Sequence, residues 1–278
     1  MMTSRPFSVL LSLYAREHAD WFAACLCSLY RQTVQADEII LVLDGPVGAE
    51  LQKVIDDFQS RLPLKIISLP KNLGLGHALN QGLQYCRHEW IMRMDTDDVS
   101  IPERFAQQWQ YIEQNPDVAV FSAQVAEFIT DAAQPERLKS VPLNPTAIRD
   151  YAQWRNPINH MAVVYRKSVV LAVGSYCHHQ GMEDYNLWLR ILAGGYIVHN
   201  MANVLVHVRA GHDLYDRRRG WQYIRSEWQL LQLKRKLKIQ ACLPAFSCFI
   251  LRSGSRLLSA RLLRSLYQHL RQNINKSL

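Results

Sequence analysis

Three carboxylates stand within four residues in the segment Asp95-Thr96-Asp97-Asp98. The apolar run 90–94 (WIMRM) leads directly into them, so we expect them at the end of a buried strand. Carboxylate oxygens bind hard divalent cations such as Mg²⁺ and Mn²⁺, and residues two apart on a strand point the same way. The segment therefore predicts a metal site. The alternative is an acidic turn that caps the following helix.

The elements that must position this cluster alternate along the first hundred residues. Apolar runs predict strands, and segments with helical spacing lie between them. The expected strands are 7–13, 38–43, 65–69 and 90–94, and the expected helices are 19–32, 48–60 and 76–86. This alternation is typical of parallel strands in an open, doubly wound sheet, which binds ligands beyond the carboxyl ends of its strands. Asp44 also follows a strand, so we expect Asp44 and Asp95 to face one crevice.

The second half of the sequence predicts a less regular order of elements. The pattern Ser100-Ile-Pro-Glu103 is typical of a capping box and indicates a helix over 102–115. Residues 118–130 are apolar and β-branched, whereas 131–159 are polar and typical of a loop. A strand at 161–165, a helix at 183–193 and one or two strands over 196–209 complete the expected order.

The composition indicates one large domain with a basic tail. The chain has 278 residues, and 49% of them are hydrophobic, enough to bury a large core. Its six cysteines form no CxxC pair, so we expect neither a zinc site nor a disulfide framework. We therefore expect the protein in a reducing cytosol. The formal net charge is +8, and residues 217–278 hold fourteen Lys and Arg but a single acid. Such a tail favours an anionic partner, either a membrane or a nucleic acid. Its longest apolar stretch, 241–251, is too short to span a bilayer but can lie on one.

Six ordered segments resemble the family-2 bacterial glycosyltransferases, especially those of exopolysaccharide, capsule or O-antigen biosynthesis. They are FSVLLSLY (7–14), CLCSLYRQT (25–33), EIILVLDG (38–45), KNLGLGHALNQGL (71–83), WIMRMDTDD (90–98) and GMEDYNLWLRI (181–191). The resemblance implies an α/β fold of the GT-A type, a Rossmann-like open sheet of nucleotide-diphospho-sugar transferases, over residues 1–220. Residues 221–278 would form a basic, amphipathic helical extension.

The same resemblance implies roles for individual residues. The donor would be bound by Asp44, Asn72, Gly74, Asp95 and Arg209, with Asp95 on the ribose or the metal. Asp97 and Asp98 would hold a divalent ion, Mn²⁺ or Mg²⁺, and His212 or His207 could add a ligand. A carboxylate of the pair Glu183-Asp184 would take the proton of the acceptor hydroxyl. Adjacent helical residues point about 100° apart, so we favour Asp184, with Glu183 as the alternate; a structural role at the helix start is the other reading.

The implied enzyme moves a sugar from a nucleoside-diphosphate sugar, with UDP as the expected nucleotide, to a hydroxyl of a glycan or a polyprenyl-diphosphate-linked glycan. It would invert the anomeric carbon and depend on a metal. We expect it in the cytoplasm, peripheral on the inner face of the cytoplasmic membrane through its tail.

Two other functions fit parts of the sequence. A sugar-nucleotide nucleotidyltransferase would need a glycine-rich basic loop after the first strand, but residues 13–18 contain no glycine. A nucleic-acid-binding protein would interleave aromatic or glycine-rich surfaces with its charge, whereas leucine dominates this tail. We therefore expect no nucleic-acid partner.

Overall fold

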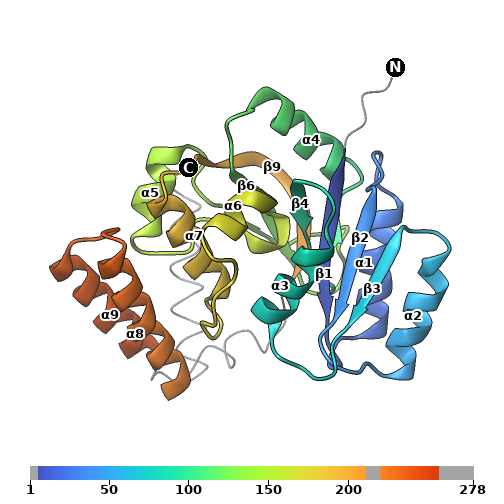
Figure 1. Ribbon diagram of the computed structural model, residues 1–278, viewed down its shortest axis with the longest axis horizontal. Coiled ribbons are helices and arrows are strands. Elements are labelled where there is room, and N and C mark those ends of the chain that lie inside the picture. Colours follow the sequence, from blue (N-terminus) through green and yellow to red (C-terminus); the bar gives the residue numbers. More distant parts are fainter. Residues whose placement is uncertain (1–5, 211–219, 257–278) are drawn as a thin grey trace.

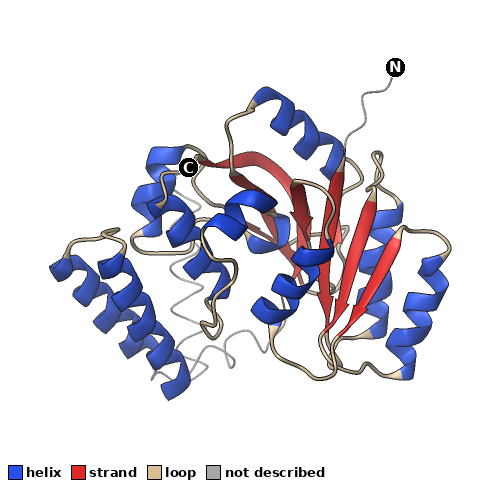
Figure 2. Cartoon of the chain, in the orientation of Figure 1, coloured by secondary structure: helices blue, strands red, loops and turns tan. Residues whose placement is uncertain are grey.

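The computed structural model describes residues 6–210 and 220–256. Its helices lie on both faces of one long sheet (Figures 1 and 2). The strands are β1 (Phe7–Leu13), β2 (Glu38–Leu43), β3 (Leu64–Ser68), β4 (Trp90–Arg93), β5 (Val99–Ser100), β6 (Val120–Phe128), β7 (Arg137–Lys139), β8 (Val164–Arg166) and β9 (Val198–Arg209). The helices are α1 (Ala19–Tyr30), α2 (Ala49–Gln59), α3 (Leu75–Tyr85), α4 (Arg104–Gln114), α5 (Pro145–Ala152), α6 (Lys167–Ala172), α7 (Glu183–Ala193), α8 (Trp221–Lys236) and α9 (Cys242–Arg256), with a 3₁₀ turn, η1, at His160–Ala162.

The described strands form a mixed sheet in the order β3-β2-β1-β4-β8-β6-β9-β5, with β7 added to β6. The pairs β3–β2, β2–β1 and β1–β4 are parallel, as the alternating pattern predicts. Beyond β4 the pairing changes, because β8 runs antiparallel to both β4 and β6. The crevice at the carboxyl ends of β1, β2 and β4 is therefore bordered by a second, mixed half of the sheet.

Two hydrophobic cores, one on each face, fix this sheet. Alternate residues of β1, beginning with Phe7 and Val9, face the core under α1, α2 and α4. Leu10 faces the other core, which α3, α5, α6 and α7 cover. In α3, Gly82 packs against β1 and β2 so closely that a Cβ would lie 2.7 Å from Val42 Cγ2. Both faces of the central strands are buried, which explains their nearly continuous apolar sequences.

Three local expectations were wrong. The loop expected over 131–159 contains β7 and α5, and the Asn144 side chain caps α5 by accepting a hydrogen bond from Ala147 N (2.9 Å), with Pro145 in the first turn. The strand expected over 161–165 is the turn η1 followed by β8. Ser100 does not cap α4; it lies in β5, and its hydroxyl accepts from Arg104 Nη1 (3.0 Å).

The helices α8 and α9 form an antiparallel pair beside α7 (Figure 1). Buried contacts join α8 to the body: His179 Nε2 pairs with Ser226 O (2.8 Å), and Lys234 Nζ donates to Gln153 O (2.5 Å). Within the described ranges, no helix has the length and apolarity needed to cross a membrane. The division of the chain at residue 220 stays a prediction.

Candidate active site

The acidic cluster lies directly after β4, where the sequence places it. One ligand oxygen from each of Asp95, Asp97 and Asp98 can be chosen so that all three lie within 4.8 Å of one another. Asp95 and Asp97 are half-buried, whereas Asp98 is buried. The strand itself ends at Arg93, so the turn after β4, and not strand alternation, brings the carboxylates together.

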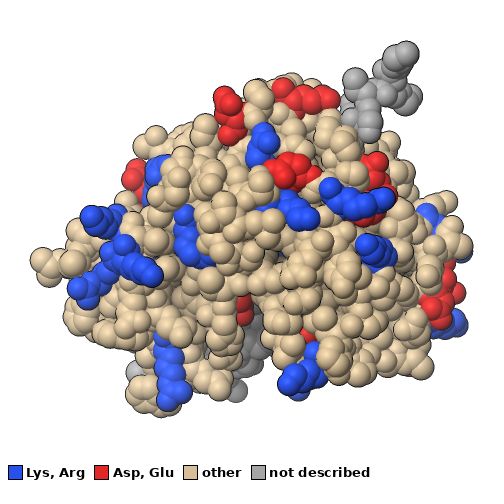
Figure 3. Space-filling view, viewed as in Figure 1, with Lys and Arg blue, Asp and Glu red and all other residues tan. Residues whose placement is uncertain are grey.

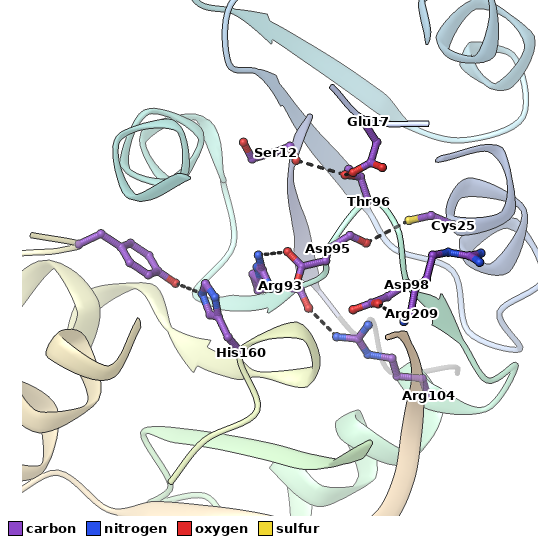
Figure 4. Close-up of polar contacts among 11 residues, drawn as sticks. Ser12, Glu17, Cys25, Arg93, Asp95, Thr96, Asp98, Arg104, His160 and Arg209 are labelled. Carbon is purple, nitrogen blue, oxygen red and sulfur yellow. Dashed lines mark hydrogen bonds and ion pairs between the residues drawn. The ribbon is translucent and has the colours of Figure 1, made fainter. Parts of the chain in front are cut away.

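Two contacts hold this turn, one through its backbone and one through a side chain. The Cys25 thiol, from α1, donates to Asp95 O (3.4 Å). The Thr96 hydroxyl donates to Glu17 Oε2 (2.9 Å), in the segment between β1 and α1 (Figure 4). The segment after β1 and helix α1 therefore fix the turn that carries the cluster.

Asp98 joins the cluster to the end of β9. Its Oδ1 accepts from Arg209 N (3.0 Å), while its buried Oδ2 has no hydrogen-bond partner among the described residues. The Arg209 guanidinium lies 4.6 Å from the ring centroids of both Trp21 and Phe128. The backbone of Arg209 thus borders the cluster, and its role in donor binding stays a prediction.

Asp97 and Asp98 are held in an environment that disfavours their charge. Burial, together with the negative charges of Asp95 and Glu17, raises the pKa of Asp97 to about 7. Burial and the charges of Asp97 and Asp95 hold the pKa of Asp98 well above its ordinary value. A divalent cation would relieve this repulsion and satisfy the unpartnered Asp98 Oδ2. The residues present therefore fit a Mg²⁺ or Mn²⁺ site.

Asp44 organises the loop that leads into α3. Its Oδ1 accepts from Leu73 N (2.7 Å) and its Oδ2 accepts from Gly74 N (2.9 Å). Gly45 has a φ of +89°, and a Cβ there would lie 2.7 Å from Asn72 N. The predicted donor residues Asp44, Asn72 and Gly74 are thus brought together. Both carboxylate oxygens already accept a backbone N–H, so any contact of Asp44 with a nucleotide must use their remaining lone pairs; this contact stays a prediction.

The pair Glu183-Asp184 begins α7, as the sequence predicts. Asp184 Oδ2 accepts from Asn156 Nδ2 (2.6 Å), and Oδ1 accepts from Tyr185 N (2.7 Å). Glu183 packs toward α3, where a Cβ on Gly76 would lie 3.3 Å from Glu183 Cγ. Burial raises the pKa of Glu183, which is the direction a general base working near neutral pH requires. The two side chains have different neighbours, and the choice between them stays a prediction.

His160 and Tyr176 join the turn η1 to the segment before α7. His160 Nε2 pairs with the Tyr176 hydroxyl (2.9 Å), and both residues are buried. Burial raises the pKa of Tyr176, and the negative charges of Asp184 and Asp95 raise it further. Of the two histidines predicted as metal ligands, His207 is half-buried in β9 opposite Val99 of β5, and His212 lies outside the described residues.

Four residues that support the site were not singled out from the sequence: Arg93, Cys25, Asn156 and Tyr176. Of these, only Arg93 carries a clear signal. A charged residue inside the apolar run WIMRM must be paired when the strand is buried, and the nearest acid is Asp95. The other three are recognisable only from contacts between distant segments.

The fold is of the GT-A-like class, in which a mixed α/β sheet presents an acidic cluster at the end of a central strand. Residues 8–171 match the sequence pattern of the family described as "Glycosyl transferase family 2". The chain belongs to this family and is a glycosyltransferase.

Two curated relatives and one solved structure show how far the similarity extends. The chain is 48% identical over 262 residues to the amylovoran biosynthesis glycosyltransferase AmsE of Erwinia amylovora, covering 94% of this chain and 98% of that protein. It is 38% identical over 221 residues to the UDP-Gal:alpha-D-GlcNAc-diphosphoundecaprenol beta-1,3-galactosyltransferase of Escherichia coli, covering 80% of each. The mannosyltransferase PcManGT of Pyrobaculum calidifontis, solved with GDP-Man and Mn²⁺, superposes with a TM-score of 0.64 at 16% identity over 96% of this chain and 81% of that one.

Proposed function

We propose that the protein transfers a sugar from a nucleoside-diphosphate sugar, with UDP as the nucleotide, to a hydroxyl of a lipid-linked glycan during the synthesis of a cell-surface polysaccharide. The observation that carries this proposal is the cluster of Asp95, Asp97 and Asp98 at the crevice, with a buried Asp98 oxygen free to bind a cation. The Escherichia coli relative, whose name states a UDP-Gal donor and a diphosphoundecaprenol-linked acceptor, supports the choice of substrates.

Asp97 and Asp98 would hold the divalent ion, Mn²⁺ or Mg²⁺, and His212 remains a candidate third ligand. The ion supplies charge stabilisation for the diphosphate that leaves the sugar. Asp44, Asn72 and Gly74 form the side of the crevice where the nucleoside would bind, and Asp95 faces the ribose. Arg209, whose backbone N donates to Asp98 Oδ1, would contact the diphosphate through its guanidinium.

The reaction itself is a single displacement. Asp184 takes the proton of the acceptor hydroxyl, with Glu183 as the alternate, while the hydroxyl oxygen attacks the anomeric carbon. The new glycosidic bond forms on the face opposite the bond to the diphosphate, which breaks, so the anomeric configuration inverts. Asn156 holds one oxygen of Asp184 in place and leaves its remaining lone pairs for the proton.

We further propose that the protein works on the inner face of the cytoplasmic membrane, attached through α8 and α9. A groove of about 550 Å³ on this pair is lined by Trp221, Ile224, Arg225, Trp228, Gln229, Gln232 and Phe249. An adjoining groove of about 590 Å³ shares Gln232 and is lined by Arg235, Lys236 and Lys238. Aromatic side chains beside cations are the combination that favours an anionic lipid surface.

Thermal stabilisation by nucleotides tests the proposed reaction. A panel of nucleoside-diphosphate sugars, screened with and without Mn²⁺, should raise the melting temperature only for the true donor and its nucleotide, because only bound ligands stabilise by mass action. Asp97→Ala should abolish the part of this rise that depends on Mn²⁺. A panel in which no uridine or other nucleotide stabilises the wild-type protein, with or without metal, would rule the proposal out.

A further inference from the structure

Arg93 is a buried cation placed directly behind the acidic cluster. It ends β4, and its side chain is 2% exposed. Its Nη1 donates to Asp95 Oδ2 (2.6 Å), and its Nη2 donates to Asp95 Oδ1. Figure 4 shows the guanidinium and the carboxylate facing one another. Both oxygens of Asp95 are therefore engaged by one guanidinium from the protein interior.

Hydrogen bonds to both its N and its O hold the backbone of Arg93 in place, which fixes the point from which its side chain extends. Arg93 N donates to Val163 O (3.0 Å), and Arg93 O accepts from Nη2 of the fully buried Arg104 (2.6 Å). The Arg104 guanidinium also contacts Ser100 and Gln108, which are neutral. Of these two buried arginines, only Arg93 is in direct contact with the cluster's carboxylates.

The contact with Arg93 reduces the net negative charge of the cluster. When all three carboxylates are ionised, as metal binding requires, the cluster and the paired guanidinium carry two negative charges, which match one divalent cation. The Asp95 side chain is 31% exposed, so its lone pairs that Arg93 does not use face the crevice. An Asp95 carboxylate in a bidentate pair is a poorer metal ligand but still accepts hydrogen bonds from hydroxyl groups.

We propose that Arg93 is a positioning residue that keeps Asp95 from coordinating the metal and presents it to the hydroxyl groups of the donor nucleotide. The cluster then takes a single divalent ion, on Asp97 and Asp98. This inference rests on the proposed function, because it assumes a metal-dependent nucleotide donor.

The two halves of the pair should change metal affinity in opposite directions. With Arg93→Met, Asp95 is released, and the affinity for Mn²⁺ alone should rise about five- to tenfold, the scale of one unit charge acting near the site in a strongly screened environment. With Asp95→Asn, the unpaired Arg93 charge should lower Mn²⁺ affinity by a similar factor. Both variants should bind UDP about tenfold more weakly at saturating Mn²⁺, measured by titration calorimetry.

Arg93→Lys separates charge from geometry, because lysine keeps the charge but cannot form the bidentate pair. Its Mn²⁺ affinity should stay near the wild-type value while its UDP affinity falls. Arg166→Met is the matched control: Arg166 donates to Val118 O and Pro116 O, at the far end of β8, and should change neither affinity.

Loss of both Mn²⁺ and UDP affinity in Arg93→Met, or no change of either affinity in both variants, would overturn the role of Arg93. Should Arg93→Met not fold, Arg93→Lys and Asp95→Asn still test the two parts of the inference. If the wild-type protein binds UDP equally well without Mn²⁺, the metal-dependent function fails instead, which distinguishes the two failures.

Discussion

Asp184 is the residue on which the proposed chemistry depends most directly. Asp184→Asn keeps the shape of the side chain and removes its capacity to take a proton. Turnover should fall at least about a hundredfold, the usual scale of general-base catalysis, while UDP affinity stays unchanged. Steady-state kinetics and calorimetry on the same preparation measure both.

Glu183→Gln is the matched control for Asp184→Asn, since it neutralises the neighbouring acid at the same helix start. We expect a smaller loss of turnover from it. The reverse order, with Glu183→Gln the more damaging change, would transfer the role of base to Glu183, the side chain that packs toward α3.

His160 should make stability depend on pH. Burial, with the positive charges of Arg93 and Lys139, holds the pKa of His160 well below its usual value near 6.5. The unfolded chain therefore binds a proton that the folded chain does not, so this contribution to stability is complete above about pH 6.5 and is lost as the pH falls toward the lower folded pKa.

The test compares wild type with His160→Gln, whose amide can still pair with Tyr176. Urea unfolding between pH 5 and 8 should show a flatter acid limb for the variant. If the free energy of unfolding depends on pH in the same way in both proteins, His160 is not the source of the pH dependence, since the other titrating groups are common to both.

At the scale of elements, the contact between α3 and the sheet depends on the absence of a side chain at Gly82. Gly82→Ala forces a Cβ against Leu10 and Val42, so the free energy of unfolding should fall by about 1–3 kcal/mol despite the better helix propensity of alanine. Gly254→Ala, in α9 with open space around it, should be neutral or slightly stabilising. Equal stabilities of the two variants by urea unfolding would show that α3 shifts to accommodate the methyl group.

The elements also show which signals a single sequence carries. The first four strands and three helices were predicted because their apolar residues recur in short runs or with helical spacing. The runs of β1, β2 and β4 are almost wholly buried, whereas β3 is only partly buried and was predicted from Ile66 and Ile67. The second half was predicted less well, because β8 is three residues long and α5 depends on one Asn-Pro cap. Asp95, Asp97 and Asp98 are close together because they are close in sequence. The contacts of Asp44 with Leu73, and of Asp184 with Asn156, join segments about thirty residues apart and needed the structure.

At the scale of the whole molecule, cations surround the C-terminal helices. Figure 3 shows several Lys and Arg side chains and few acidic ones on the side that carries α8 and α9. Several large apolar side chains are exposed on the same pair; Leu243, Phe246, Ile250 and Leu251 are each at least half exposed. Together they form the surface expected to attach to lipid.

Co-sedimentation with vesicles tests this surface. Phe246→Ser with Ile250→Ser should markedly reduce binding to vesicles that contain phosphatidylglycerol, because apolar area inserted into the interface is lost. Leu138→Ser, which removes an exposed leucine on β7, should bind like the wild type. Unchanged binding of the double variant, or equal binding to neutral vesicles, would contradict the role of α8 and α9 in docking.

The contact between α8 and the segment before α7 links the proposed lipid-docking surface to the candidate catalytic acids. Ser226 of α8 pairs with His179 and, through its hydroxyl, with Gln180 O (2.9 Å), a few residues before the acids that begin α7. Docking of α8 and α9 on lipid, as proposed, would therefore also set the height of the start of α7 above the bilayer. An acceptor carried on a lipid would then be found by diffusion in two dimensions, and the enzyme would select acceptors by their reach from the membrane as well as by their chemistry.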